Sequence, residues 1–162
     1  MGISEDLQPQ VLDRGYTFER ILVSLDGSAT AERSLSFARA LSERHGSRVL
    51  LARIIGESTD ESVRVARAYL VQAATDLGFH GIEARTVVRA GPVSKSLLSI
   101  AAEEGISLIA MSTHGGMTPD AQPYGDVGRE ILQSSSIPIL AVPAHAQPGR
   151  PVERIRTILV VC

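Results

Sequence analysis

The chain has little cysteine, few aromatic side chains and no long apolar run. Its only cysteine is the last residue, Cys162, so an internal disulfide is excluded and a reducing, cytoplasmic location is expected. No apolar stretch approaches the roughly 20 residues that a membrane-spanning helix needs. The acidic start of the sequence, residues 1–6, carries no apolar signal segment, so we expect neither secretion nor a membrane partner.

An excess of one charge is also absent. The 162 residues include 16 Lys and Arg against 18 Asp and Glu, for a net charge of −2. Basic residues are dispersed and aromatic residues make up 4%, so neither a cationic stripe nor a stacking surface for nucleic acid is predicted. The hydrophobic share of 44% is ordinary for a globular protein, and the length suits one domain with a sizeable core.

Apolar runs rich in branched residues alternate with patterns of helical period. The runs that we expect to be strands are 20–25, 48–55, 82–88, 106–111 and 138–142. Nearly continuous apolar strands separated by helices indicate a parallel sheet that is covered on both faces. With right-handed crossovers, this is a doubly wound α/β fold with a five-stranded parallel sheet and helices on both faces.

Each helix carries start or stop signals. The first has Ser28 or Thr30 as its cap and Gly46 just past its end. We expect Gly78 to close the second helix. The third begins at Gly91-Pro92 and should bury Val93, Leu97 and Ala101; the fourth runs from about Gly125, with Val127 and Ile131 facing inward.

Two small-residue turns follow predicted strands. The segment Arg20-Ile-Leu-Val-Ser-Leu-Asp-Gly-Ser28 ends in an acid and a glycine. The segment Met111-Ser-Thr-His-Gly-Gly116 leads to Gly125-Asp-Val-Gly-Arg-Glu-Ile-Leu132, a helical pattern. A glycine-containing loop between a strand and a helix start is suited to an anion, because backbone N–H groups and the positive end of the helix dipole face it.

These two turns, in this order and spacing, resemble the universal stress protein family over roughly residues 18–143. The resemblance implies strand order 3-2-1-4-5 and a Thr-His-Gly loop that holds ATP phosphates. It further implies that Asp26 accepts hydrogen bonds from ribose or adenine, while Ser24 and Ile54 line the adenine pocket. The positions assigned to nucleotide binding are Ser24, Asp26, Gly27, Ser28, Ile54, Met111, Thr113, His114, Gly115, Gly116, Gly125, Asp126 and Val127. ATP is therefore the implied cofactor.

The chain departs from the pattern of the nucleotide-binding members. Thr118 stands where a second glycine belongs, and the loop from Thr118 to Gly125 is three residues short. Asp126 replaces the Ser or Thr that would donate a hydroxyl to phosphate. A carboxylate only accepts hydrogen bonds and adds negative charge beside a polyanion. Asp126 also suits a helix N-cap, a metal ion could bridge it to phosphate, and Asp26 could simply order its own turn.

No catalytic constellation emerges from the sequence. His114 has no acid or nucleophile at a recognisable spacing, and its spacing to His45, His80 and His145 matches no metal site, so we expect neither an enzyme nor a metal centre. Two functions are left open. One is a stress-response module that acts through dimerisation and contacts with an unknown protein partner, with degenerate, weak or absent ATP binding. The other is an ATP-binding universal stress protein with weak ATPase activity.

Segments outside the expected domain carry separate predictions. Residues 1–17 show no periodicity and are expected to form an extension, and residues 144–153 form a polar linker. Residues 154–162 echo the opening strand and could begin a truncated second domain, or could be an ordinary apolar strand. The fifth strand, 136–143, contains Pro138, which favours a sheet edge. In the family this strand commonly pairs with a second subunit, so a homodimer is expected.

Overall fold

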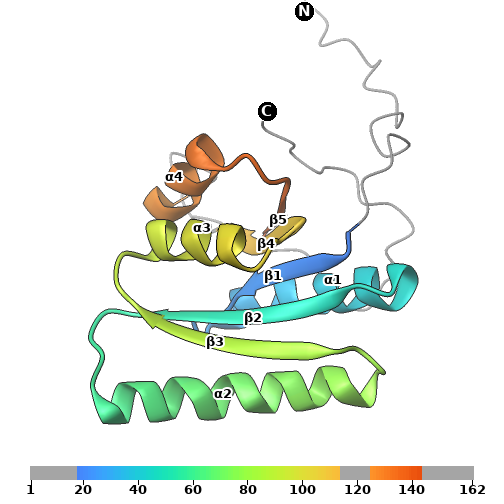
Figure 1. Ribbon diagram of the computed structural model, residues 1–162, viewed down its shortest axis with the longest axis horizontal. Helices are drawn as coiled ribbons and strands as arrows, with labels where there is room; N and C mark the ends of the chain where they lie inside the picture. Colours follow the sequence, from blue (N-terminus) through green and yellow to red (C-terminus); the bar gives the residue numbers. More distant parts are fainter. Residues whose placement is uncertain (1–17, 114–124, 144–162) are drawn as a thin grey trace, which may run out of the picture.

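The computed structural model describes residues 18–113 and 125–143 of the chain, in which strands and helices alternate. The elements are β1 (Arg20–Ser24), α1 (Ala29–His45), β2 (Arg48–Ile55), α2 (Asp60–Phe79), β3 (Ala84–Ala90), α3 (Val93–Glu103), β4 (Leu108–Thr113), α4 (Asp126–Ser134) and β5 (Ile139–Pro143). All neighbouring strands are parallel, in the order β3-β2-β1-β4-β5. Helices α1 and α2 pack on one face and α3 and α4 on the other (Figure 1). The predicted fold class and strand order are confirmed.

Alternation along the strands builds the two halves of the core. Ile21 and Val23 of β1 pack toward α1 and α2, whereas Leu22 packs toward α3 and α4, and all three are 0% exposed. Burial of this kind contributes about 1.5–3 kcal/mol for each large aliphatic side chain. The central strand is therefore fixed from both faces, which holds its carboxyl end rigidly.

Two helices end in a motif that the sequence patterns did not reveal. After the end of α2, Gly81 takes a left-handed conformation with φ of 72°. The Gly81 N–H donates to the Gly78 carbonyl, and the Ile82 N–H donates to the Leu77 carbonyl. Gly105 and Ile106 repeat the arrangement after α3. This is the Schellman motif, in which an apolar residue follows the left-handed glycine.

The two motifs correct three expectations. Gly78 does not close α2, which continues to Phe79, because Gly81 takes the left-handed position. The third and fourth strands begin two residues later than predicted, at Ala84 and Leu108. The apolar residues that suggested earlier starts, Ile82 and Ile106, are buried in the helix-stop motifs instead.

Two valines were expected to be buried and are exposed. Val93 is 37% exposed in the first turn of α3, and Val127 is 39% exposed in the first turn of α4. Both lie at helix starts that follow the carboxyl ends of strands, where part of each side chain remains in contact with solvent. Leu97, Ala101 and Ile131, deeper in these helices, are buried as predicted.

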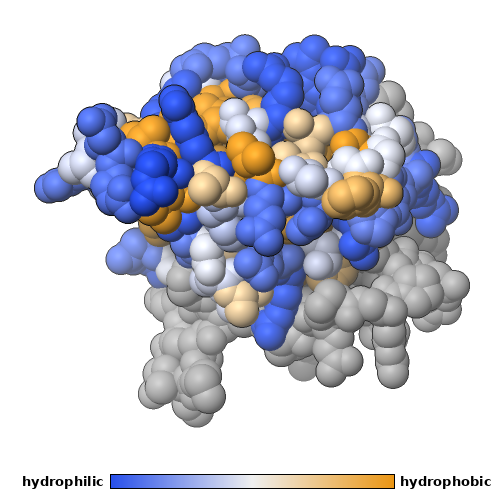
Figure 2. Space-filling model, turned by 90° about the horizontal axis from the view of Figure 1, so that it is seen from below, coloured by the Kyte–Doolittle hydropathy of each residue, from blue (hydrophilic) through white to orange (hydrophobic). Residues whose placement is uncertain are grey.

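The two edges of the sheet are β3 and β5. Among the strands of the described residues, β5 lies at the edge beside β4, which confirms its predicted edge position. Pro138 precedes β5 and accepts a hydrogen bond from the Ile109 N–H at 3.0 Å. The side of the molecule formed by α2 carries the exposed apolar residues Val65, Val71 and Phe79 among charged ones (Figure 2). None of the helices in the described part of the chain is long and apolar enough to cross a membrane.

Candidate functional site

The carboxyl end of the sheet contains the point where the strand order reverses. From β1 the chain moves outward through β2 and β3, then returns to the other side of β1 with β4 and β5. In open α/β sheets, ligands bind beyond the carboxyl ends of the strands at such a point. Ser24 is the last residue of β1, and Ile54 and Met111 lie near the carboxyl ends of β2 and β4. By strand alternation they share the face covered by α3 and α4, so the structure brings these three predicted residues together.

The turn after β1 is held by its own side chains. Asp26 Oδ1 accepts from the Ser28 N–H at 2.8 Å, and Ser28 Oγ accepts from the Ala31 N–H at 3.2 Å as the N-cap of α1. Gly27 between them has φ of 88°, a conformation that glycine adopts without strain. Asp26 therefore does order its own turn. An exposed carboxylate offers about four acceptor positions, so this bond alone does not exclude a ligand role.

The start of α4 differs from the expectation in one respect. Gly125 is the N-cap, without a side-chain cap, and Asp126 is the first helical residue rather than the cap. Asp126 is exposed and is the only acidic residue of the first turn. Further along, Ser94 of α3 donates a hydrogen bond to Glu130, which fixes α4 against α3. The helix start is thereby held at the carboxyl end of the sheet, with a carboxylate at its positive dipole end.

Several predicted site residues cannot be placed. His114, Gly115 and Gly116 lie outside the described residues, as does Thr118. Thr113 ends β4, but its side chain is likewise outside the description. Within residues 18–113 and 125–143, no group of three or more His, Cys, Asp or Glu side chains could hold a metal ion.

Arg53 and Tyr69 adjoin this end of the sheet and were not foreseen. The Arg53 guanidinium carbon lies 5.2 Å from the centroid of the Tyr69 ring, a cation–π contact between β2 and α2. The same guanidinium lies against the turn after β1, because a Cβ added to Gly27 would meet its nitrogens at 3.7 and 3.8 Å. Arg53, a charged residue between apolar neighbours in the run 48–55, is the only sequence signal for this contact.

The charges around Tyr69 shift its ionisation. Burial raises the pKa of the Tyr69 phenol above its usual value, and the nearby Glu32 carboxylate raises it further. Arg53 acts in the opposite direction, and Asp26 adds a smaller upward effect on the pKa. The phenol oxygen is buried, without a hydrogen-bond partner of good geometry among the described residues. The α1–β2–α2 side of this end thus combines two carboxylates with one guanidinium.

Comparison with known proteins agrees with this architecture. The sequence pattern of the Universal stress protein family matches residues 17–143. No curated protein matches the chain. A solved universal stress family protein from Burkholderia pseudomallei is 27% identical, with a TM-score of 0.64, over 80% of this chain and 98% of its own.

Two further solved structures contain nucleotides. The universal stress protein from Archaeoglobus fulgidus in complex with dAMP is 20% identical, with a TM-score of 0.65, over 78% of this chain and 98% of its own. A universal stress protein in complex with cAMP is 18% identical, with a TM-score of 0.66, over 79% and 98%. At these identities the two structures establish the shared fold. Because the family pattern covers most of the sequence, the chain belongs to the universal stress protein family.

Proposed function

We propose that this protein is a stress-response module that acts through self-association and contacts with a protein partner, and that its binding of ATP phosphates is weak or lost. The observation that carries the proposal is Asp126, an exposed carboxylate on the first residue of α4. In a family site that uses this helix start for phosphate, Asp126 would place a negative charge where a hydroxyl donor is needed.

An aspartate in place of a serine or threonine at position 126 carries an electrostatic cost large enough to weaken the binding of ATP phosphates. Two unit charges about 4 Å apart repel by about 4 kcal/mol at an effective dielectric of 20. Salt and solvent reduce this at an exposed helix start. A charge-assisted hydrogen bond contributes only about 1.5–3 kcal/mol, so the repulsion offsets one or two good phosphate contacts. The sequence from Thr118 to Gly125 is also three residues shorter than the pattern of the nucleotide-binding members.

A second candidate is an adenine-nucleotide-binding member with weak ATPase activity. The two solved relatives with nucleotides carry cAMP and dAMP, each with a single phosphate. The family resemblance assigns Ser24, Asp26 and Ile54 to the adenosine, and these residues lie at or just after the ends of the neighbouring strands β1 and β2. A nucleotide with one phosphate would meet less repulsion from Asp126 than ATP does.

The substitution Asp126→Ser separates the two candidates. It restores a hydroxyl donor, removes one repelling charge and keeps a residue suited to a helix start. Under the proposal, ATP affinity rises at least tenfold, about 1.4 kcal/mol, in calorimetric titrations with and without magnesium. Asp60→Ser is the matched control, because Asp60 is also the exposed first residue of a helix, α2. Micromolar ATP binding by the wild type that Asp126→Ser weakens contradicts the proposal.

Self-association through β5 is the other half of the proposal. Its support is the position of β5 at an edge of the sheet, with the buried Ile139, Leu140 and Val142 close to that edge. In general, a strand at the edge of a sheet can act as a template for pairing with a second copy of the chain. Sedimentation velocity at micromolar concentration should show a dimer. Monomer alone at those concentrations contradicts this half and leaves the ATP experiment unaffected.

A further inference from the structure

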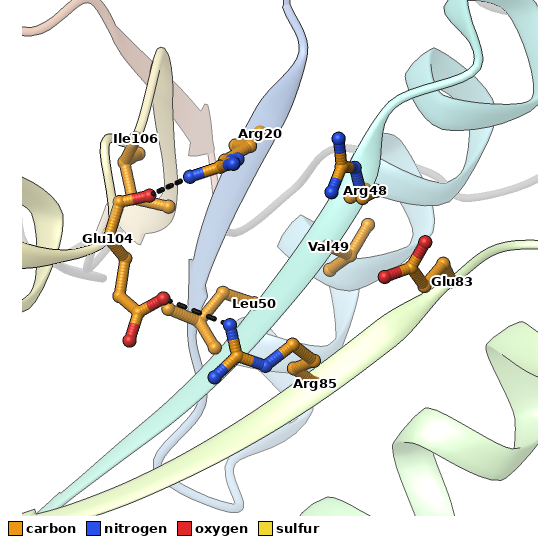
Figure 3. A pocket seen from close by; sticks show the side chains of 8 residues that line it. All are labelled: Arg20, Arg48, Val49, Leu50, Glu83, Arg85, Glu104 and Ile106. Carbon is orange, nitrogen blue, oxygen red and sulfur yellow. Dashed lines mark hydrogen bonds and ion pairs between the residues drawn. The ribbon is translucent and has the colours of Figure 1, made fainter.

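A hollow lined by both charged and apolar side chains lies at the amino end of the sheet, opposite to the candidate nucleotide site. It has a volume of about 110 Å³ and lies between the starts of β1, β2 and β3 and the turn between α3 and β4 (Figure 3). The charged residues that line it are Arg20, Arg48, Glu83, Arg85 and Glu104. Three guanidinium groups against two carboxylates leave the lining with a net charge of +1.

Strand register places two of the cations side by side. Arg20 on β1 is the register partner of Arg48 on β2, so both side chains project from the same face of neighbouring strands. Like charges directly opposite each other destabilise a sheet pair. Arg85 enters from β3, one row further along, beside Leu50. The fold therefore gathers three cations although their mutual repulsion opposes the arrangement.

Two of the three arginines are held by Glu104. Arg20 donates from Nη1 to the Glu104 backbone carbonyl at 2.8 Å, and Arg85 donates from Nη1 to Glu104 Oε2 at 3.1 Å (Figure 3). Each guanidinium has five N–H donors, so both retain donors beyond these contacts. Arg48 makes no side-chain hydrogen bond or ion pair with any residue in the described ranges. Arg48, which has no ion-pair partner in the described ranges and lies beside two guanidinium groups that Glu104 engages, is suited to bind an anion.

The size of the hollow limits the ligand. Pockets for nucleotides and drug-sized molecules measure about 300–1,000 Å³, so a nucleoside does not fit in 110 Å³. A tetrahedral oxyanion fits, and arginine forks bind phosphate oxygens in pairs of parallel hydrogen bonds. We propose that this hollow binds phosphate, either as the free ion or as the phosphate group of a small monoester, with Arg48 as its principal ligand. The site is independent of ATP binding at the other end.

Titration of the full-length chain with inorganic phosphate tests the site. Calorimetry at constant ionic strength, with chloride as the balancing anion, should show saturable binding by the wild type. Arg48→Met should weaken it at least tenfold, because the unpaired guanidinium is lost. Arg64→Met, which alters an exposed arginine paired with Glu61 on α2, should bind as the wild type does.

Two further arms keep the test decisive. Arg48→Lys retains the charge but not the fork, so a partial loss of affinity supports the site even if Arg48→Met folds poorly. O-phosphoserine titrated in parallel identifies the source: tighter binding than inorganic phosphate points to a monoester, and weaker binding to the free ion. The proposal is overturned if the wild type shows no saturable binding of either probe, or if Arg48→Met and Arg48→Lys both bind as the wild type does.

Discussion

Helices α1 and α4 both begin at the carboxyl end of the sheet, on either side of the strand reversal, yet their first turns are built differently. The start of α1 is closed by side-chain oxygens: Ser28 caps Ala31, and Asp26 accepts from the Ser28 N–H. The start of α4 has Gly125 as its N-cap, without any side-chain hydrogen bond, and Asp126 in its first turn.

The difference separates two uses of a helix start. Side-chain oxygens at α1 satisfy backbone donors permanently, which stabilises the turn that carries Asp26. At α4 the N-cap is a glycine, which has no side-chain oxygen to accept from the backbone N–H groups. A helix start that binds phosphate needs such N–H groups for the ligand. Asp126 then supplies negative charge near the same donors. At α4 the N-cap residue supplies no side-chain acceptor, and the first helical side chain is a carboxylate.

Removal of the side-chain cap at α1 should have the largest effect on stability. Ser28→Ala deletes the hydroxyl that accepts from the Ala31 N–H and contacts Thr30 Oγ1 at 2.9 Å. We expect the free energy of unfolding to fall by about 1 kcal/mol in urea denaturation. Ser36→Ala is a suitable control, because Ser36 lies within α1 and its hydroxyl bonds only to the Glu32 carbonyl. Equal losses in the two variants would show that Ser28 is not an effective cap.

The converse change at α4 should be stabilising and smaller. Gly125 has φ of −65° and ψ of 170°, an extended conformation that any residue adopts. Gly125→Ser adds a side-chain oxygen at the N-cap and restricts the unfolded chain, so we expect a gain of about 0.3–1 kcal/mol in the same assay. A loss of stability would indicate that the groups at the start of α4 already have acceptors that the new hydroxyl displaces.

The glutamate in the first turn of α1, Glu32, should also change the pKa of Tyr69, with a still smaller effect on stability. Folding raises the pKa of this phenol, so its contribution is complete below the unfolded value of about 10 and is lost as pH rises through the folded value. The stability of the wild type relative to Tyr69→Phe should therefore fall above pH 10. Phenolate absorbance should show that Glu32→Gln lowers the pKa of Tyr69. Glu61→Gln, at a glutamate paired with Arg64, should not change it.

Most of the fold could be predicted from the sequence because the strands are nearly continuous apolar runs. The bounds of β2, Arg48–Ile55, match the run from which it was expected. The errors concentrate at helix ends, where Ile82 and Ile106 look like strand residues but complete a helix stop. An apolar residue indicates burial. Both strand residues and the residue after a left-handed glycine are buried. Hydrophobic pattern alone cannot distinguish the two.

The residues of the candidate site could be predicted only where a short sequence motif marks them. The sequence points to Ser24, Asp26 and Ser28 through a strand end and a turn, and in the structure they lie at the end of β1, in the turn after it and at the N-cap of α1. The contact between Arg53 and Tyr69 was not predicted, because it joins β2 to α2 and no short sequence motif contains both residues. The arginines at the opposite end escaped for the same reason. Strand register brings Arg20 and Arg48 together from positions 28 residues apart in the sequence.

The return of the chain to β1 has a consequence for the order in which the protein assembles. Ser107 N–H donates to the Arg20 carbonyl at 2.9 Å across 87 positions of sequence, so one edge of β1 stays bare until most of the chain has been synthesised. Such distant pairing slows folding, because loop closure must precede the contacts that reward it. A ligand at the strand reversal binds only the chain in which β4 has docked, and it stabilises that state by mass action. Ligand occupancy there would therefore favour newly made protein in which β4 has already docked against β1.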